Sequence, residues 1–397
     1  MQSIPRKKTL GRRVLLGLGI LAAICALLAG MVYAVTNVWA NLGAQAVDLG
    51  RAIFGDKVVA NVENILLTSE DKLKQFKYGI TKAQPVVPWK PDTLPVSSQS
   101  NAPSSNGMDI PVKPNVDQVW VLPGLPSLGS ISGEGQWTPY LWDVDGKVVA
   151  YRTFLQPDHQ RPYALVAVVA FNLQATRLHF VLGYDEPKSS VMVTRPARIP
   201  ASDMQPGRIL AAFNGGFKAQ HGHFGVMLNG VTLIPPRDGF GTVGIYADGK
   251  VLIGAWGKDV GPSPQLVSYR QNGPLIVQNG QINPHTALTD PQDWGYTTYG
   301  DTATGRSSLG ISKDGNTLYF AVGFDLTLPA LAKAIQDAGV YNAIQLDINN
   351  FYTHFEAINF DQKNKPQAAP LLDQMKGPGD HRYLSIDSRD FFYLTMK

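Results

Sequence analysis

The chain of 397 residues is 44% hydrophobic and 17% charged, an ordinary composition for a globular protein with one large or two medium domains. Its formal charge is +4, and five positive charges lie between Arg6 and Arg13, so the rest of the chain is close to neutral. This balance gives no electrostatic support for a nucleic-acid partner.

The N-terminal sequence predicts a membrane anchor. Residues 1–13 form a basic tail, and an uncharged apolar run, VLLGLGILAAICALLAGMVYAV, extends from Val14 to Val35. About twenty such residues are enough for a helix to cross the hydrocarbon core. Lys and Arg precede the run and none follows it until Arg51, which predicts a cytoplasmic N-terminus and an extracytoplasmic remainder. We therefore expect a single-pass membrane protein anchored by residues 14–36.

A cleaved signal peptide is the alternative interpretation of this segment, because VYA and VWA offer small-residue cleavage sites. The apolar run is longer than the roughly 7 to 15 residues of a typical signal core, which favours the uncleaved anchor. The only cysteine, Cys25, lies within the run, so the exported part has no disulfides and depends on its core for stability.

A helical stalk and a linker are expected next. Residues 37–80 have helix-like spacing, and an apolar stripe runs along them that includes Val58, Val62 and Ile65. Such a helix could pair with another copy, lie on the bilayer, or fold back onto the main domain, and the pattern leaves these possibilities open. Residues 81–118 are rich in Pro, Ser and Asn, a composition typical of a linker.

The block from 119 to 397 predicts the folded domain. Its short apolar runs are broken by Gly, Asn and Asp, and the D-G pairs at 248–249 and 314–315 indicate hairpin turns. One helix interrupts the strands, because LTLPALAKAIQDAGV has apolar residues at i, i+3, i+4 and i+7, with Thr327 as a cap and Gly339 as a stop. The expected fold class is α+β, a mixed and mostly antiparallel sheet domain with few helices.

The segment AIQLDINNF carries an acid, Asp347, out of an apolar strand. In this strand Ile344 and Leu346 share one face, which we expect the helix to cover, and Asp347 lies on the other. Functional groups often lie where the strands of helix-covered sheets end. Asn349 and Asn350 then predict a turn that offers amides to a ligand. Capping of local backbone amides explains Asp347 by itself at least as well.

A second candidate is AAFNGGFKAQHGHFG, in which an apolar run ends at Asn214. Gly215 and Gly216 would let the backbone approach a ligand closely. His221 and His223 point the same way in extended chain and could serve as acid and base. Two histidines are too few to predict a metal site, although a bound divalent ion is conceivable, and ordinary loop histidines explain at least one of them.

A third candidate is TATGRSSLGIS, in which Arg306 could grip a phosphate through two hydrogen bonds and Ser307 could complete the cradle. A surface ion pair is the ordinary explanation of a single Arg. Glu134 in GEGQW is a weaker candidate, a carboxylate between glycines beside Trp137, whose ring could stack on a sugar.

Together these stretches resemble the phosphodiester glycosidase family, roughly from Glu134 to the C-terminus. Three segments carry the resemblance and follow the family's order: FNGGF at 213–217, GRSSLGISKDG at 305–315, and LTLPALAKAIQDAGVYNAIQLD at 326–347. The resemblance implies that Asn214, Arg306 and Asp347 line one site. We expect their side chains to converge on one cleft.

The activity implied by the resemblance is hydrolysis of a sugar bonded to a phosphodiester through its anomeric carbon. Arg306 would neutralise the departing phosphate, and Asp347 would act as a base or stabilise the oxocarbenium-like centre. Asn214 would hold sugar hydroxyls, and His221 or His223 could relay a proton. Gly215, Gly216, Ser307, Asn349 and Glu134 complete the expected substrate-binding set. No cofactor is predicted, and the expected partner is a glycosyl phosphodiester or a cell-envelope glycan.

One departure from the family pattern separates two functions. Most members follow the Leu-Asp pair with a glycine run, whereas here Ile348 to Thr353 include the bulky Phe351 and Tyr352. The difference implies another substrate or lost activity. The two hypotheses are an anchored extracytoplasmic hydrolase and a catalytically inactive glycan-binding or envelope-scaffold protein on the same fold. A metal-dependent hydrolase centred on His221 and His223 is a third, weaker interpretation.

Overall fold

The computed structural model describes residues 50–51, 53–83, 85–89, 120–125, 131–287, 294, 300–348, 350–376 and 381–397. The basic tail at 1–13 and the expected anchor at 14–36 lie outside these residues, as does Asn349. Within the described part, no helix has both the length and the apolar character needed to span a bilayer.

The chain divides into two compact units, residues 1–62 and 63–397. Helix α3 (Asp56–Thr81) provides the first described residues of the larger unit. That unit also includes part of the segment expected to be a linker, because Trp89 is 8% exposed and packs edge-on against Phe154, with the Arg152 guanidinium 4.3 Å from its ring. The larger unit therefore begins before the domain boundary expected at residue 119.

Three antiparallel sheets form the larger unit in the described part of the chain. Sheet 1 has the order β1 (Thr138–Trp142), β2 (Val148–Leu155), β3 (Val166–Asn172), β14 (Thr317–Leu326), β13 (Thr304–Ile311), β15 (Asn342–Gln345), β11 (Leu275–Gln278), β12 (Gln281–Ile282). Sheet 2 has the order β7 (Val231–Ile234), β6 (Val226–Leu228), β10 (Leu266–Gln271), β8 (Gly241–Tyr246), β9 (Val251–Ala255). Sheet 3 has the order β17 (Pro366–Pro370), β16 (Phe355–Phe360), β5 (Ile209–Asn214), β18 (Phe391–Met396), β4 (Thr176–Val181).

Local sequence signals explain several of these elements. The D-G pair at 248–249 turns β8 into β9, and the pair at 314–315 turns β13 into β14, as predicted. Helix α5 (Leu328–Asp337) begins where the Thr327 side chain accepts a hydrogen bond from the Ala330 N–H, and it is followed by Gly339 at φ 86°. Short 3-10 turns complete the described elements, namely η1 (Ala219–His221), η2 (Pro284–Ala287), η3 (Asp373–Met375) and η4 (Arg382–Leu384).

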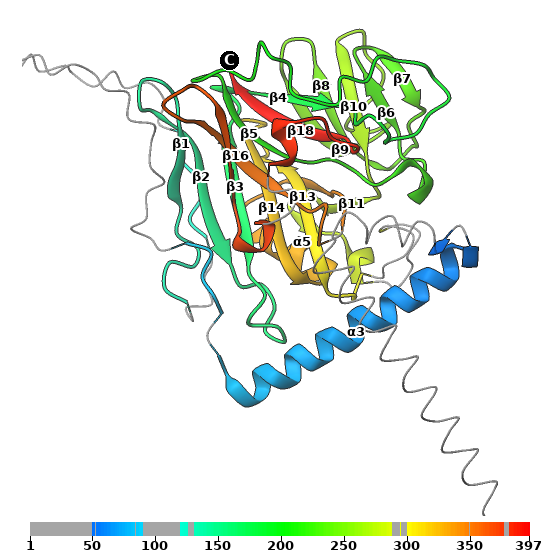
Figure 1. The fold of residues 1–397 in the computed structure, drawn as a ribbon, viewed down its shortest axis with the longest axis vertical. Helices are drawn as coiled ribbons and strands as arrows, with labels where there is room; N and C mark the ends of the chain where they lie inside the picture. Colours follow the sequence, from blue (N-terminus) through cyan, green and yellow to red (C-terminus); the bar gives the residue numbers. More distant parts are fainter. Residues whose placement is uncertain are drawn as a thin grey trace, which may run out of the picture. The chain divides into compact units, whose positions relative to one another are not determined.

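Sheet 1 is covered on both faces (Figure 1). On one face it packs against sheet 3 through aromatic rings, including Phe320 and Phe213 with centroids 4.6 Å apart. On the other face it packs against α5, whose buried residues share a core cluster with Ala343. This mostly antiparallel arrangement with few helices confirms the α+β prediction for the described part.

The face covered by α5 is not the one expected. Ile344 and Leu346 belong to the main core cluster, which also holds Phe213 and Phe355 of sheet 3, whereas Ala343 packs with the helix. Both faces of β15 are buried, so alternation could not show which face the helix would take. Asp347 therefore emerges from a strand enclosed on both faces.

Candidate active site

Asp347 lies where sheet 1 meets sheet 3. The N–H of Leu346 still donates to Ser307 O on β13 at 2.9 Å, but the N–H of Asp347 donates to Gly215 O at 3.0 Å. Gly215 directly follows β5, so the chain changes partner from one sheet to the other between these two residues. Asp347 is thereby fixed beside the end of β5, next to Asn214.

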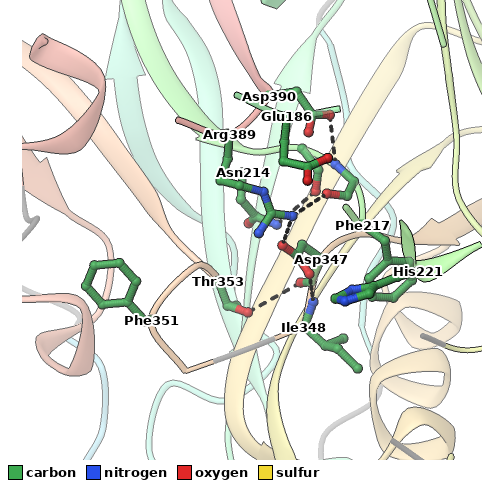
Figure 2. Close-up of polar contacts among 12 residues, drawn as sticks. Glu186, Asn214, Phe217, His221, Asp347, Ile348, Phe351, Thr353, Arg389 and Asp390 are labelled. Carbon is green, nitrogen blue, oxygen red and sulfur yellow. Dashed lines mark hydrogen bonds and ion pairs between the residues drawn. The ribbon is translucent and has the colours of Figure 1, made fainter. Parts of the chain in front are cut away.

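The Asp347 carboxylate is enclosed by fixed donors, as Figure 2 shows. Its Oδ2 lies 2.5 Å from Nη2 of Arg389, and its Oδ1 accepts from the Ile348 N–H at 2.9 Å. Its backbone carbonyl accepts from the hydroxyls of Ser307 at 3.2 Å and Thr353 at 3.4 Å. The side chain is about nine-tenths buried. The position and orientation of Asp347 are thus set by contacts with Ser307 on β13, with Arg389 before β18, and with Ile348 and Thr353 in the turn that follows it.

Burial raises the pKa of Asp347 above its ordinary value, because a buried carboxylate loses the solvation of its charge. The Arg389 guanidinium opposes this rise, the Asp390 carboxylate adds to it, and Lys218 opposes it. A carboxyl group with a raised pKa is a better base than an exposed one once it is ionised. These are the properties expected of a group that accepts a proton from water.

Arg389 comes from the segment before β18 and is buried. Its Nη2 also donates to Gly216 O at 3.1 Å, and its guanidinium carbon lies 4.7 Å from the centre of the half-buried Tyr352 ring. Burial lowers its pKa, but Asp347 and Asp390 outweigh burial and the net pKa is raised, so Arg389 stays charged. Its Nε is buried and has no hydrogen-bond partner among the described residues. One donor of this cation is therefore unused within the described structure.

The two glycines approach protein groups closely. The Gly215 N–H donates to Asp390 O and the Gly216 N–H to Asp390 Oδ2, at 3.0 and 3.1 Å. A Cβ on Gly216 would lie 2.6 Å from the guanidinium carbon of Arg270, which pairs with Asp390 at 2.7 Å. The sequence predicts that the two glycines let the backbone approach a ligand closely. In the structure they instead approach the buried ion pair of Arg270 and Asp390, which holds this segment beside Asp347.

Asn214 is held by protein groups on both sides of its amide. Its Nδ2 lies 3.0 Å from Ser307 Oγ, and its Oδ1 accepts from the His354 N–H at 3.2 Å. The imidazole of His354 lies 3.3 Å from Glu356 Oε2, and burial lowers its pKa to about 3, so the ring stays neutral. These contacts give Asn214 a positioning role at the junction of the sheets.

Arg306 faces away from this cluster. Its guanidinium is fully buried and donates to Leu326 O, Gln345 Oε1 and Thr302 O at 2.6–2.9 Å. Burial lowers its pKa to about 9. Alternation along β13 explains the difference from its neighbour, because Ser307 points to the face where Asn214 lies. The structure therefore brings Ser307, Asn214 and Asp347 together and gives Arg306 contacts that bind three strands of sheet 1.

The two histidines lie on the turn that follows Gly216. His221, at the end of η1, is half-buried, and Figure 2 shows its ring directed toward Asp347 and Ile348. His223 is exposed, with φ 48°. The turn is held by Glu186, whose Oε2 accepts from the Ala219 N–H at 2.9 Å. The histidine whose ring is directed toward Asp347 is therefore His221.

Glu134 lies at the far edge of sheet 1, where its Oε1 accepts from the Gln156 N–H at 2.9 Å. It is buried between the segments that lead into β1 and out of β2. In the described part of the chain, no group of three or more His, Cys, Asp or Glu side chains is arranged to hold a metal ion. A cavity of about 930 Å³ beside α3 and one of about 480 Å³ at sheet 2 both lie away from Asp347.

Sequence reasoning missed Arg389, Asp390, Glu186 and Lys218. The signal for the first two is weak but visible in SRDFFYL, where an Arg-Asp pair stands directly before an apolar strand. Both residues of this pair are buried at the start of an interior strand, and buried charges need partners. Glu186 and Lys218 carry no such mark in the sequence.

A family model described as phosphodiester glycosidase matches residues 207–347. This segment of the chain is therefore similar to that family. The phosphodiester glycosidase match includes Asn214, Ser307 and Asp347, and it ends before Arg389, so the cation paired with Asp347 lies outside the matched segment. No curated protein sequence matches the chain.

Two solved structures are similar to this chain in part. One is the catalytic domain of zebrafish N-acetylglucosamine-1-phosphodiester alpha-N-acetylglucosaminidase, auto-inhibited by its pro-peptide, with 14% identity and a TM-score of 0.39 over 64% of this chain and 86% of that chain. The other is a hypothetical protein from Synechocystis, with 9% identity and a TM-score of 0.30 over 59% of each chain.

Proposed function

We propose that this protein hydrolyses the bond between the anomeric carbon of a sugar and the oxygen of a phosphodiester. The observation that carries the proposal is the buried pair of Asp347 and Arg389 at the junction of sheets 1 and 3. The pair joins a carboxyl group of raised pKa to a cation with an unused donor. A base and a phosphate-binding cation are the two groups that this reaction needs most.

In the proposed reaction, the oxygen of water forms a bond to the anomeric carbon while the bond from that carbon to the phosphate oxygen breaks. Asp347 accepts the proton of the water, and the products are a free sugar and a phosphate monoester. The monoester leaves as an anion, so little demand falls on a general acid. His221, whose ring points toward Asp347, relays the proton to solvent.

In this proposal, Arg389 is the cation that binds the phosphate. Its Nε has no protein acceptor among the described residues, and a guanidinium can bind two phosphate oxygens at once. Arg306 is less suited, because all three of its guanidinium nitrogens already donate to protein oxygens. For phosphate to reach Arg389, the Tyr352 ring that stacks over it must move aside.

A second candidate is a protein that binds a glycan without cleaving it. Asp347 already occupies Nη2 of Arg389, and Tyr352 covers the guanidinium, so the site is closed in this structure. This closure is a specific observation against turnover, and so favours the inactive protein over the hydrolase. Membrane anchoring with an extracytoplasmic domain is part of the proposal in either form, on the support of the N-terminal sequence alone. Protease added to intact cells would then degrade the domain.

The test uses the full-length protein in detergent with a panel of glycosyl phosphodiesters and an assay for released sugar. We expect release by the unaltered protein, and we expect Asp347→Asn to bind the same compound without turnover. Asp373→Asn is the matched control, because that carboxylate is exposed and remote. Binding without release by the unaltered protein supports the second candidate. Absence of both binding and release across the panel would reject both functions.

A further inference from the structure

Helix α3 is attached to the rest of the larger unit through its polar side. The carboxylate of Asp71, which is 8% exposed, accepts two hydrogen bonds from Arg161 at 2.8 and 2.6 Å. Asn64 Oδ1 accepts from the Thr302 hydroxyl at 2.5 Å, and Lys74 pairs with an acid of β14. A buried bidentate ion pair fixes which side of the helix faces inward.

The opposite side of α3 is apolar and exposed. We call it the outer stripe, and within the larger unit it consists of Ile65 (65% exposed), Leu66 (46%), Leu73 (66%), Phe76 (68%) and Ile80 (67%). Successive helical residues are rotated by about 100°, which places the middle of this stripe about 180° from Asp71. A surface helix normally buries its apolar side, so the inverted orientation indicates a contact outside the described fold.

The shape of the outer stripe favours a flat apolar surface over a second helix. Ile65 and Leu66 mark its edges, about 100° apart around the helix, which is broader than the narrow seam of a two-stranded coiled coil. Exposed lysines, Lys72 and Lys77, lie just beyond the two edges, and the exposed Glu70 farther round the helix pairs with Lys74. Coiled coils pair opposite charges along their edges, whereas lysine on both edges suits an anionic surface.

The sequence before the helix supplies the nearest such surface. The uncharged run that ends at Val35 predicts a membrane anchor, and only about thirty residues separate it from Ile65. We propose that the outer stripe of α3 lies in the surface of the lipid bilayer, with its apolar side chains among the acyl chains and Lys72 and Lys77 at anionic headgroups. The domain is then held against the membrane on one fixed side.

The experiment uses full-length protein reconstituted into vesicles of phosphatidylcholine with a minority of phosphatidylglycerol. Cys25, the only cysteine, is replaced by serine, and a polarity-sensitive fluorophore is attached at Phe76→Cys or Ile80→Cys. Lys258→Cys, an exposed position on the turn after β9, is the matched control. We expect a blue-shifted emission and quenching by lipid-borne quenchers at 76 and 80, and neither effect at 258.

Two further variants test the charged edges. Lys72→Glu with Lys77→Glu should abolish the blue shift at position 80, and omission of phosphatidylglycerol should reduce it. Water-like emission at 76 and 80 in the presence of vesicles would overturn the proposal. Efficient disulfide formation between two copies of the unlabelled Phe76→Cys protein, without lipid quenching of the labelled one, would also overturn it and assign the stripe to a second copy of the chain.

Discussion

Arg389 and Asp347 are 42 positions apart in the sequence, yet Nη2 of the first lies 2.5 Å from Oδ2 of the second. Arg389 stands before β18, an interior strand of sheet 3, and Asp347 follows β15 of sheet 1. Their contact exists only because the two sheets pack face to face. The pair therefore forms only after the two sheets have packed together, and the chemistry proposed for the site depends on the same packing.

Arg389→Ala should lower the free energy of unfolding by about 3 kcal/mol or more, because it leaves the buried Asp347 carboxylate without its cation. Asp347→Asn should cost less, since the amide keeps an oxygen that can accept from Arg389. The double variant should be more stable than the sum of the two single effects predicts, by about 0.5–3 kcal/mol. Denaturant unfolding of the four proteins measures this, and strict additivity would mean that the pair is not coupled.

The pH dependence of turnover should follow the raised pKa of Asp347. Because the base must be ionised, the rate should fall as pH falls through this pKa, at a midpoint above the value of about 3.9 for an ordinary Asp. The protonated form is favoured by burial, so the contribution of this group to stability should be lost as pH rises through the same range. A rate–pH profile and unfolding at each pH, compared with those of Asp347→Asn, test both directions.

Gly216→Ala should lower the free energy of unfolding by about 1–3 kcal/mol, because a Cβ there would lie 2.6 Å from the Arg270 guanidinium in a closely packed site. The matched control is Gly261→Ala, since a Cβ at that position meets no atom within 4 Å. Equal stability of the two variants would show that the segment moves freely to accept the methyl group.

Arg306→Met should lower the free energy of unfolding without a selective loss of affinity for a phosphorylated ligand. The substitution leaves three buried oxygens, among them Leu326 O and Gln345 Oε1, without their donor. Arg389→Met should instead reduce ligand affinity. Denaturant unfolding and ligand titration of the two variants separate a structural role from a role in binding phosphate. A selective loss of affinity in the Arg306 variant would show that Arg306 binds the ligand.

The sequence predicts best those features that depend on neighbours along the chain. Thr327 caps the start of α5, and Gly339 follows its end, as predicted. The D-G turns also form as predicted, because caps and tight turns depend on only a few neighbouring residues. Asp347 is visible because an acid that ends an apolar run is unusual. The partner of Asp347 could not be predicted from the sequence. Which of the many arginines pairs with it depends on how the two sheets pack.

The opposite placements of Arg306 and Ser307 show where pattern reasoning ends. All eight residues of β13 are buried, so the strand has no polar face to mark one side as solvent. Alternation separates the two side chains, but which one meets Asn214 depends on the side on which sheet 3 packs. The same reason explains why α5 covers Ala343 and leaves Ile344 to the core between the sheets.

Strand β18 lies between β5 and β4 in sheet 3, and it follows every other described strand in the sequence. The two residues before it, Arg389 and Asp390, supply the partners of Asp347 and Arg270. During translation, therefore, sheet 3 remains open and both buried charges lack their counterparts until this strand leaves the ribosome. A growing chain can hold no completed site, so any hydrolytic activity is delayed until synthesis has passed β18.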